Sequence, residues 1–196
     1  MAAIRVGSQN QLAPEMLDSM HEFRRAMFVG RLDWALPLIG GTERDQYDTA
    51  EAIYLIAYHE DARRVTACAR LLPTTGSYML PELFPELLGE TPAPRHPSIW
   101  ELSRFAADVR SSAGGRVLSF SETSLQLLSQ VFALARKYDV ERLVVVTSIG
   151  IERLLLRAGF EVHRLSAPAR VGDALSVALF IEVPKASPRD ADASLH

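Results

Sequence analysis

A strand-like stretch in the middle of the chain carries charged side chains where a buried strand would have none. The sequence from 96 to 109, HPSIWELSRFAADV, is largely apolar, yet Glu101, Ser103 and Arg104 interrupt it. An unpaired charge loses its hydration on burial, which costs several kcal/mol. A carboxylate and a guanidinium can persist there only with partners. Such groups in a cleft can transfer protons or hold a charged substrate.

Similar residues occur earlier in the chain. Arg24 and Phe28 are four residues apart, so on a helix they share one face. Arg70 lies in an apolar segment and points to the same side as Cys68 and Leu72 if that segment is a strand. The other members of the set lie in the polar segment after the first helix: Trp34, Asp45 and Asp48.

Two interpretations of these residues remain open. The aspartates of the polar segment could fold back and pair with Arg70 and Arg104, and the resulting network could simply hold the loop. Alternatively, the charges could surround a ligand site, and the convergence of six charges with two aromatic rings favours this second interpretation. We therefore predict that one cleft is surrounded by Arg24, Asp45, Asp48, Arg70, Glu101 and Arg104.

The elements that must position these residues follow from hydrophobic spacing and end signals. Pro14 and Glu15 suit the start of a helix that reaches about residue 32. A long loop is predicted over 32–50, and two strands over 51–58 and 64–73, with a polar turn at 59–63 between them. The second half of the chain is predicted to contain, in order, an irregular segment at 73–98 with a short helix near 80–88, the strand of 96–109, a helix at 119–138, a strand at 141–148, a helix at 150–160 and strands at 161–166 and 174–184.

This order predicts one α/β domain over residues 1–185. The strands are apolar on both faces, so helices should cover both sides of a mixed sheet. The polar tail, residues 186–196, is predicted to be disordered.

Composition narrows the classes of function. The chain has 196 residues and a net charge of −3, without the basic bias of a nucleic-acid-binding protein. It contains neither an apolar run that could span a bilayer nor an N-terminal signal-peptide core. Cys68 is the single cysteine, lies in an apolar run and lacks neighbours with metal-ligand spacing, so a buried structural thiol is expected. We expect a cytoplasmic protein that binds neither metal, membrane nor nucleic acid.

The charged and aromatic residues fall in a pattern that resembles the acyl-homoserine-lactone synthases, the autoinducer synthases of bacterial quorum sensing. The pattern is Arg24-x3-Phe28-x5-Trp34, Asp45-x2-Asp48, Arg70, Phe84 and Glu101-x-Ser103-Arg104. The sequence VTSIGIERLLLRAGF, residues 146–160, also resembles the C-terminal half of the family.

The resemblance implies a fold, two substrates and a reaction. The fold would be similar to that of GNAT N-acyltransferases, with a sheet splayed to admit a pantetheine arm. The enzyme would acylate S-adenosyl-L-methionine from an acyl-[acyl carrier protein], then close the lactone and release 5′-methylthioadenosine. No metal or tightly held cofactor is implied.

The chemistry suggests roles for the matched residues. Glu101 is the candidate base for the substrate ammonium, with Asp45 second, and Ser103 and Arg104 complete the catalytic candidates. Backbone N–H groups near Arg104 and Phe105 could stabilise the oxyanion. Residues expected to contact S-adenosylmethionine are Arg24, Phe28, Trp34, Asp45, Asp48, Arg70, Arg104 and Phe105.

The acyl chain and its carrier need further surfaces. Candidate walls of an apolar acyl pocket, each of which could instead be ordinary core, are Met79, Leu80, Phe84, Leu102, Leu125, Leu128, Val146, Thr147, Leu155 and Phe180. Basic residues that could dock an acidic carrier protein, or simply form a solvated helix face, are Arg136, Lys137, Arg142, Arg153 and Arg157.

Two alternative functions remain at this stage. One is a GNAT-type N-acyltransferase that uses acyl-CoA and another amine, although Arg24, Phe28 and Trp34 would then have no reason to occur together. The other is a non-enzymatic sensor of S-adenosylmethionine on the same scaffold. We expect the protein to be a monomer.

Overall fold

The structure of the chain, a computed structural model, describes residues 3–29, 43–59, 64–107 and 120–185. The strands are β1 (Ala3–Gly7), β2 (Ile53–His59), β3 (Arg64–Pro73), β4 (Ile99–Ala107), β5 (Arg142–Ser148), β6 (Val162–Arg164), β7 (Ala169–Val171) and β8 (Ala174–Glu182). The helical segments are α1 (Pro14–Arg24), a π-helical turn (Arg25–Val29), α2 (Met79–Leu83), a 3-10 turn (Pro85–Leu87), α3 (Glu122–Lys137) and α4 (Ile149–Arg157).

Within the described residues, all eight strands belong to one sheet. Its order is β1-β2-β3-β4-β5-β8-β6, and β7 also pairs with β8. Neighbouring strands are antiparallel except for β4 and β5, which are parallel. The predicted mixed sheet with flanking helices is therefore confirmed.

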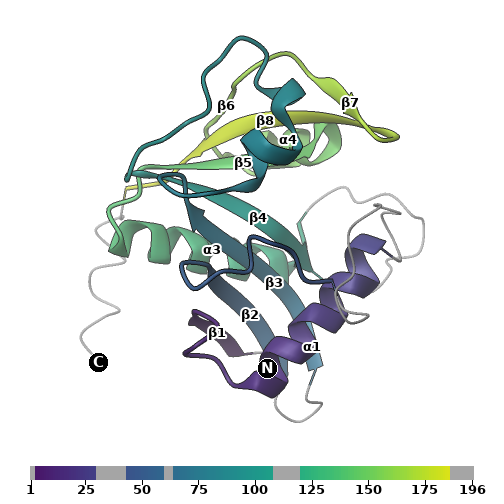
Figure 1. Ribbon diagram of the computed structural model, residues 1–196, viewed down its shortest axis with the longest axis vertical. Coiled ribbons are helices and arrows are strands. Elements are labelled where there is room, and N and C mark those ends of the chain that lie inside the picture. The colour runs from purple at the N-terminus through teal and green to yellow at the C-terminus, as the bar shows by residue number, and fades with distance from the viewer. Residues whose placement is uncertain (1–2, 30–42, 60–63, 108–119, 186–196) are drawn as a thin grey trace.

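The sheet divides between β4 and β5. These strands pair only from Ile99 opposite Arg142 to Glu101 opposite Val144. Beyond that point β4 stays paired with β3 as far as Ala107, and β5 stays paired with β8 as far as Ser148. Figure 1 shows β4 and β5 diverging from this junction. The expected splayed sheet is thus present, with two facing strand edges that are not paired with each other.

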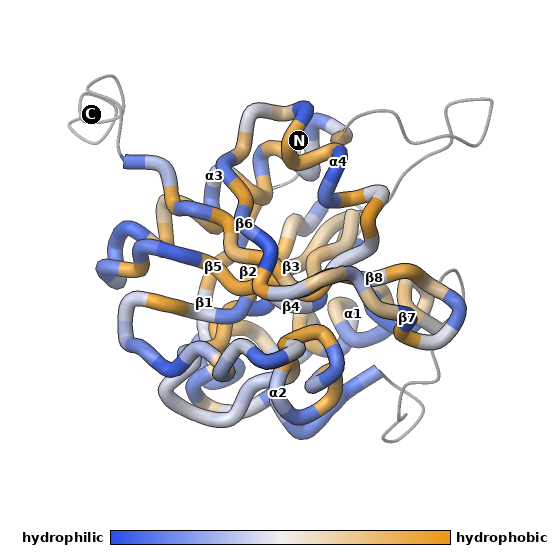
Figure 2. The backbone as a smooth tube through the Cα atoms, turned by 90° about the horizontal axis from the view of Figure 1, so that it is seen from above, coloured by the Kyte–Doolittle hydropathy of each residue, from blue (hydrophilic) through white to orange (hydrophobic). Residues whose placement is uncertain are grey.

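Two hydrophobic cores lie on opposite faces of the sheet. The α3-side core includes Leu71, Leu128 and Leu179, and the α1-side core includes Leu72 and Met20. Successive strand residues such as Leu71 and Leu72 enter different cores because side chains alternate across a strand. Figure 1 shows α1 and α3 on opposite sides of the sheet, and Figure 2 shows hydrophobic positions concentrated along the central strands.

The ends of α1, α3 and α4 carry residues that commonly begin or end helices. Pro14 occupies the start of α1, and Glu15 lies in its first turn. Ser121 caps the start of α3, since its side chain accepts from the Ser124 backbone N–H. Gly159 follows α4 with a φ of +83°, the left-handed conformation that ends many helices.

Two short strands were not predicted from sequence. The side chains of β1 are mostly exposed, so its sequence lacks the apolar alternation of a half-buried strand. β7 has only three residues. Among the described residues, no helix is both long and apolar enough to cross a membrane. The predicted tail, residues 186–196, lies outside the described residues.

The end of α4 gives a test of stability. Gly159→Ala should lower the free energy of unfolding by about 1–2 kcal/mol, because a Cβ strains a positive φ even where space is open. Gly150→Ala is the matched control: that glycine is helical, and an added Cβ would meet only the Ser148 hydroxyl at 3.7 Å. It should stabilise by up to about 1 kcal/mol. Urea unfolding of both variants measures the difference, and equal effects would contradict the conformational argument.

Candidate active site

Three arginines from three different elements meet three carboxylates in the interior. Arg24 ends α1, Arg70 lies in β3 and Arg104 lies in β4, and all three are buried. The carboxylates come from one short segment that follows the undescribed residues 30–42: Glu43, Asp45 and Asp48. Six formal charges thus form a neutral cluster, which we call the arginine–carboxylate cluster.

Asp48 links the first two arginines. Its Oδ1 accepts from Arg24 Nη1 at 2.8 Å and from Arg70 Nη1 at 2.9 Å. The same oxygen accepts from the Tyr54 hydroxyl at 2.9 Å, and Oδ2 accepts from the Asp45 backbone N–H. Burial opposes ionisation, but the attraction of Arg24 and then Arg70 is stronger and holds the pKa of Asp48 well below its ordinary value.

Asp45 contacts all three arginines. Its Oδ1 accepts from Arg70 Nη1 at 2.6 Å and from the Tyr47 backbone N–H at 2.9 Å. Its Oδ2 accepts from Arg104 Nη2 at 2.7 Å and from Arg24 Nη2 at 3.4 Å. A carboxylate has about four acceptor positions. All four are therefore occupied, and Asp45 has no position left to accept a proton from a substrate.

Glu43 is a member of the cluster that the sequence analysis missed. It is fully buried, accepts from Arg24 Nε, and accepts from Arg104 Nε at 2.9 Å. His21 Nδ1 donates to the Glu43 backbone carbonyl at 3.1 Å, because a carbonyl can only accept. In the sequence, Glu43 lies in a run of polar residues, so nothing distinguished it from an ordinary exposed glutamate. Its separation of two from Asp45, in a segment already expected to fold onto arginines, was the available signal.

A bulge in β4 explains how Glu101, Ser103 and Arg104 share one face. The pairing of β3 with β4 shifts between Cys68 and Arg70, opposite Arg104 and Phe105. Arg104 has a φ of +51°, which is uncommon for a residue with a side chain. The bulge brings Arg104 to the same side as Ser103, whose hydroxyl accepts from Arg70 Nε at 3.1 Å.

The bulge also reorients Phe105 and covers Cys68. The Phe105 side chain packs against the α3-side core, on the face opposite the arginine–carboxylate cluster. Beneath the bulge, Cys68 Sγ donates to the Arg104 carbonyl at 3.4 Å. Burial raises the pKa of the Cys68 thiol to about 12, which fits the expected structural role.

Glu101 stands beside the cluster and contacts none of its arginines directly. Its two oxygens accept from the backbone N–H groups of Met79, at 3.0 Å, and Leu80, at 2.9 Å. Burial raises the pKa of the Glu101 carboxyl, although these N–H groups and the charges of Arg70 and Arg104 oppose the rise. Glu101 therefore keeps about two acceptor positions open.

Of the two aromatic candidates for contact with S-adenosylmethionine in the N-terminal part of the chain, Phe28 lies within the described residues and Trp34 does not. Phe28 lies in the π-helical turn after α1, is buried, and has its ring centroid 5.5 Å from the Arg104 guanidinium carbon. π-Helical turns inside helices occur often at functional sites. Trp34 and the Gly40–Gly41 pair lie outside the described residues, so the role of Trp34 stays a prediction.

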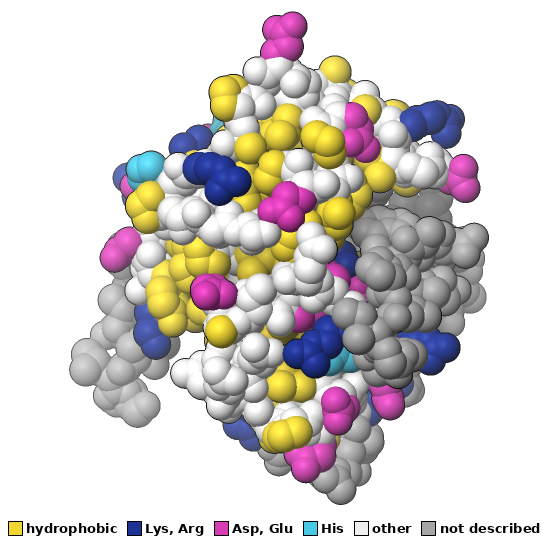
Figure 3. Space-filling view, in the orientation of Figure 1, with side chains coloured by type: hydrophobic (Ala, Val, Ile, Leu, Met, Phe, Trp, Pro, Cys, Tyr) yellow, Lys and Arg dark blue, Asp and Glu magenta, His cyan; other side chains and the backbone are white. Residues whose placement is uncertain are grey.

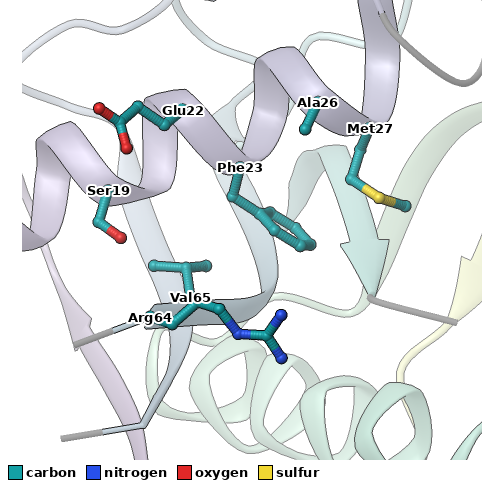
Figure 4. Close-up of a pocket in the computed structure, with 7 residues that line it drawn as sticks. All are labelled: Ser19, Glu22, Phe23, Ala26, Met27, Arg64 and Val65. Carbon is teal, nitrogen blue, oxygen red and sulfur yellow. The ribbon is translucent and has the colours of Figure 1, made fainter. Parts of the chain in front are cut away.

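One surface pocket lies between α1 and the start of β3. It has a volume of about 380 Å³ and is lined by Ser19, Glu22, Phe23, Ala26, Met27, Arg64 and Val65. Figure 4 shows these side chains, none of which belongs to the arginine–carboxylate cluster. Within the described parts of the chain, no group of His, Cys, Asp and Glu could hold a metal ion.

The acyl-pocket candidates lie on both faces of the sheet. Leu102, Leu128 and Leu155 belong to the α3-side core. Five others belong to the α1-side core or pack against it: Met79, Leu80, Phe84, Val146 and Phe180. Thr147 lies in β5 opposite Val177. Leu125 lies elsewhere, because it is 44% exposed on α3. The division of the sheet after Glu101 is where the two faces could communicate.

The docking candidates differ in their surroundings. Arg153 and Arg157 are exposed on α4, and Lys137 is exposed at the end of α3. Arg136 Nη1 donates to the Pro184 carbonyl at 3.2 Å, and the Arg142 guanidinium carbon lies 4.7 Å from the Phe180 ring centroid. On the face in Figure 3, charged side chains stand mostly singly, in contrast to the buried cluster.

Comparisons with known proteins agree on one family. The family described as autoinducer synthase matches residues 8–190. An acyl-homoserine-lactone synthase of Pseudomonas aeruginosa is 35% identical over 181 residues, which are 92% of this chain and 89% of that protein.

Solved structures support the same relationship. The AHL synthase LasI has a TM-score of 0.82 and 34% identity, over 94% of this chain and 91% of that chain. A CoA-dependent acyl-homoserine lactone synthase, BjaI, solved with SAM and isopentyl-CoA, has a TM-score of 0.82 and 28% identity over 98% and 87%. An acyl-CoA N-acyltransferase from Pseudomonas aeruginosa, 15% identical with a TM-score of 0.65, shares the fold.

The cluster predicts how stability depends on pH. Asp48→Asn should lower the free energy of unfolding at pH 7 by about 3–5 kcal/mol, because Arg24 and Arg70 lose a buried partner. The folded-state pKa of Asp48 is depressed, so its contribution exists above the unfolded pKa, about 3.9, and is lost as pH falls toward the folded value. Wild type should therefore lose more stability between pH 5 and pH 3 than the variant does.

Urea unfolding at pH 7, 5 and 3 measures both effects. Asp173→Asn, at an exposed position, is the control and should unfold like wild type. Equal acid dependence in wild type and Asp48→Asn would contradict the assignment of the depressed pKa to Asp48.

Proposed function

The chain belongs to the autoinducer synthase family and is an acyl-homoserine-lactone synthase, and we propose that its acyl donor is a fatty acyl-[acyl carrier protein]. The amine of S-adenosylmethionine attacks the thioester carbonyl. The carboxylate of the same substrate then attacks its γ-carbon and expels 5′-methylthioadenosine. The lactone product is a quorum-sensing signal, and we place the reaction in the cytoplasm, where both substrates are made.

The observation that carries the use of S-adenosylmethionine by this site is the charge of the buried residues. The arginine–carboxylate cluster is neutral, and Glu101 adds one buried carboxylate beside it. S-Adenosylmethionine carries an ammonium, a sulfonium and a carboxylate, so its net charge is +1 before the amine is deprotonated. A site with one excess negative charge complements that substrate, whereas a neutral thioester alone would not require it.

We assign proton removal to Glu101. An ammonium cannot attack a carbonyl, so a base must take its proton directly or through water. Asp45, the second candidate, has its acceptor positions filled by three arginines and a backbone N–H. Glu101 has positions left, and its raised pKa brings it closer to that of an amine.

The bulge in β4 supplies candidate donors for the oxyanion. The register of β3 with β4 gives Arg104 and Phe105 no partner in β3, and we propose that their backbone N–H groups are available to a substrate oxygen. Their strand edge faces the division of the sheet, where we place the thioester and its pantetheine arm. Fixed N–H groups at such a position stabilise a developing oxyanion. The acyl chain would then continue between the two hydrophobic cores.

The acyl donor is the least constrained part of the proposal. Two solved relatives are described as CoA-dependent, BjaI and MesI, so acyl-CoA is the competing donor. We favour the carrier protein because Arg153 and Arg157 are exposed on one face of α4, where an acidic carrier could dock.

One assay separates the competing functions. The protein is incubated with S-adenosylmethionine and either octanoyl carrier protein or octanoyl-CoA, and the lactone is detected by mass spectrometry. We expect lactone with the carrier protein and much less with CoA. Acylation of a different amine would indicate a GNAT-type acyltransferase, and binding of S-adenosylmethionine without product would indicate a sensor.

The docking surface gives a prediction. Arg153→Glu combined with Arg157→Glu should lower kcat/KM for the acyl carrier protein by about 10-fold or more at low salt, because electrostatic steering is lost. The salt dependence should flatten as well. Use of acyl-CoA should change far less. Arg5→Glu, on β1 at one end of the sheet order, changes the net charge by about −2, as each single variant Arg153→Glu or Arg157→Glu does, and so is the charge control for those single variants. An equal loss with both donors would remove α4 from docking.

The base gives a second prediction. Glu101→Gln should reduce kcat by about 10²–10⁴-fold, the usual contribution of a general base. In wild type, activity should fall as pH drops through a pKa above the ordinary glutamate value, and the variant should lose this acid limb. Calorimetric binding of S-adenosylmethionine and the melting temperature check that the site stays folded.

Glu82→Gln is the matched control for that experiment. Glu82 lies in α2, the helix whose first N–H groups Glu101 accepts from, but its own carboxylate accepts from Ser77, Tyr47 and Gln46. This variant should retain the acid limb. If Glu101→Gln kept near-normal turnover and an unchanged acid limb, the base would have to be another group.

A further inference from the structure

A methionine sulfur lies against two of the buried arginines. Arg70 Nη2 donates to Met79 Sδ at 3.0 Å, and Arg104 Nη1 approaches the same atom at 3.5 Å. Met79 is buried and begins the short helix α2. Ordinary packing would place this side chain against other apolar groups, whereas here its sulfur faces two cations.

The other two nitrogens of each arginine already have oxygen acceptors. Arg70 donates from Nε to Ser103 and from Nη1 to Asp45 and Asp48. Arg104 donates from Nε to Glu43 and from Nη2 to Asp45. A thioether is a weak acceptor compared with any of these oxygens. Arg70 Nη2 and Arg104 Nη1 are therefore the cluster nitrogens at which a stronger acceptor, such as a carboxylate, would form the most favourable new hydrogen bonds.

Arg24 offers a contrast within the cluster. Its Nε, Nη1 and Nη2 donate to Glu43, Asp48 and Asp45, respectively. All three of its nitrogens thus face carboxylates. An incoming substrate carboxylate would have to displace a protein carboxylate to reach Arg24, whereas Arg70 Nη2 and Arg104 Nη1 each carry a second N–H beside the one that faces Met79. A carboxylate could accept from these second N–H groups while Met79 keeps its contacts.

The backbone of Met79 is also fixed, because its N–H donates to Glu101. Glu101 accepts from the N–H groups of Met79 and Leu80, and Tyr78, the residue that precedes α2, provides no side-chain cap. Glu101 thereby fixes the end of α2 that carries the sulfur. Met79 therefore links Glu101, the candidate base, to Arg70 Nη2 and Arg104 Nη1.

We infer that Met79 is a positioning residue that holds Arg70 Nη2 and Arg104 Nη1 toward the point where the carboxylate of S-adenosylmethionine binds. The inference rests on the proposed function for the identity of that substrate. Lactone closure requires this carboxylate to be placed against the γ-carbon, and placement is the main contribution that a protein can make to such a step. Two guanidinium edges that are not tied to protein carboxylates orient it without burying it in a tight pair.

Two substitutions at Met79 separate this role from simple packing. Met79→Leu keeps most of the volume and removes the acceptor, so KM and Kd for S-adenosylmethionine should rise about 3- to 10-fold, in line with the loss of a hydrogen bond. Met79→Gln restores an acceptor on a side chain of similar length and should bring both constants back to within about 2-fold of wild type. KM for the acyl donor should stay near its wild-type value in both variants.

The measurements are steady-state kinetics with each substrate varied and calorimetric titration of S-adenosylmethionine alone. Leu87→Met, in the same core and fully buried, controls for repacking, and melting temperatures verify folding. A change in KM for the acyl donor alone would make Met79 only a wall of the acyl pocket and overturn the inference. Equal losses in folded Met79→Leu and Met79→Gln would also overturn it.

Failure of the proposed function is distinguishable from failure of this inference. If wild type makes no lactone, the proposed function fails, while the titration still measures whether Met79 affects binding of S-adenosylmethionine. If wild type makes lactone and Met79→Leu binds S-adenosylmethionine normally, the proposed function stands and the inference fails.

Discussion

The burial of three guanidinium groups is the constraint on which the site depends. Each would be strongly unfavourable alone, and none can be removed from the others because they share carboxylates. Asp45 contacts Arg24, Arg70 and Arg104 together, so the end of α1, the middle of β3 and the bulge of β4 are fixed to one another through a single side chain. The segment that begins at Glu43 must therefore pack against the sheet for the arginines to be tolerated there.

Burial of charged groups is unfavourable, and the cluster is accordingly neutral, with each arginine paired to carboxylates. A neutral cluster of six groups has no net charge, so the cluster as a whole does not favour a cation over an anion. Glu101 supplies the missing charge from a neighbouring position, where it is satisfied by backbone N–H groups in place of arginines. Structural charges and the candidate reactive charge are thus kept on separate partners, which allows the first set to stay paired while the second changes protonation.

Sequence reasoning could predict the cluster because charge inside apolar strands is a specific anomaly. Arg70 and Arg104 needed partners, and the polar segment after the first helix contains Asp45 and Asp48, which could fold back to them. It could not predict which acids, and Glu43 was missed because a glutamate in a polar loop is unremarkable until that loop is known to be buried. It could not assign acyl-pocket residues to a face either. The bulge at Arg104 moves Phe105 to the other side of the sheet, and Leu102 and Met79 lie in the cores on opposite faces of the sheet.

The three-residue pairing of β4 with β5 has a consequence for cooperativity. Among the described residues, ladder hydrogen bonds join the two halves of the sheet only at this short junction, so most of their cohesion must come from the two hydrophobic cores, each of which contains side chains from β2, β3, β4, β5 and β8. The halves can thus separate slightly along the free edges without breaking a ladder. Native-state hydrogen exchange would register this as amides of β4 and β5 beyond the junction opening locally, while amides between β2 and β3 exchange only through global unfolding.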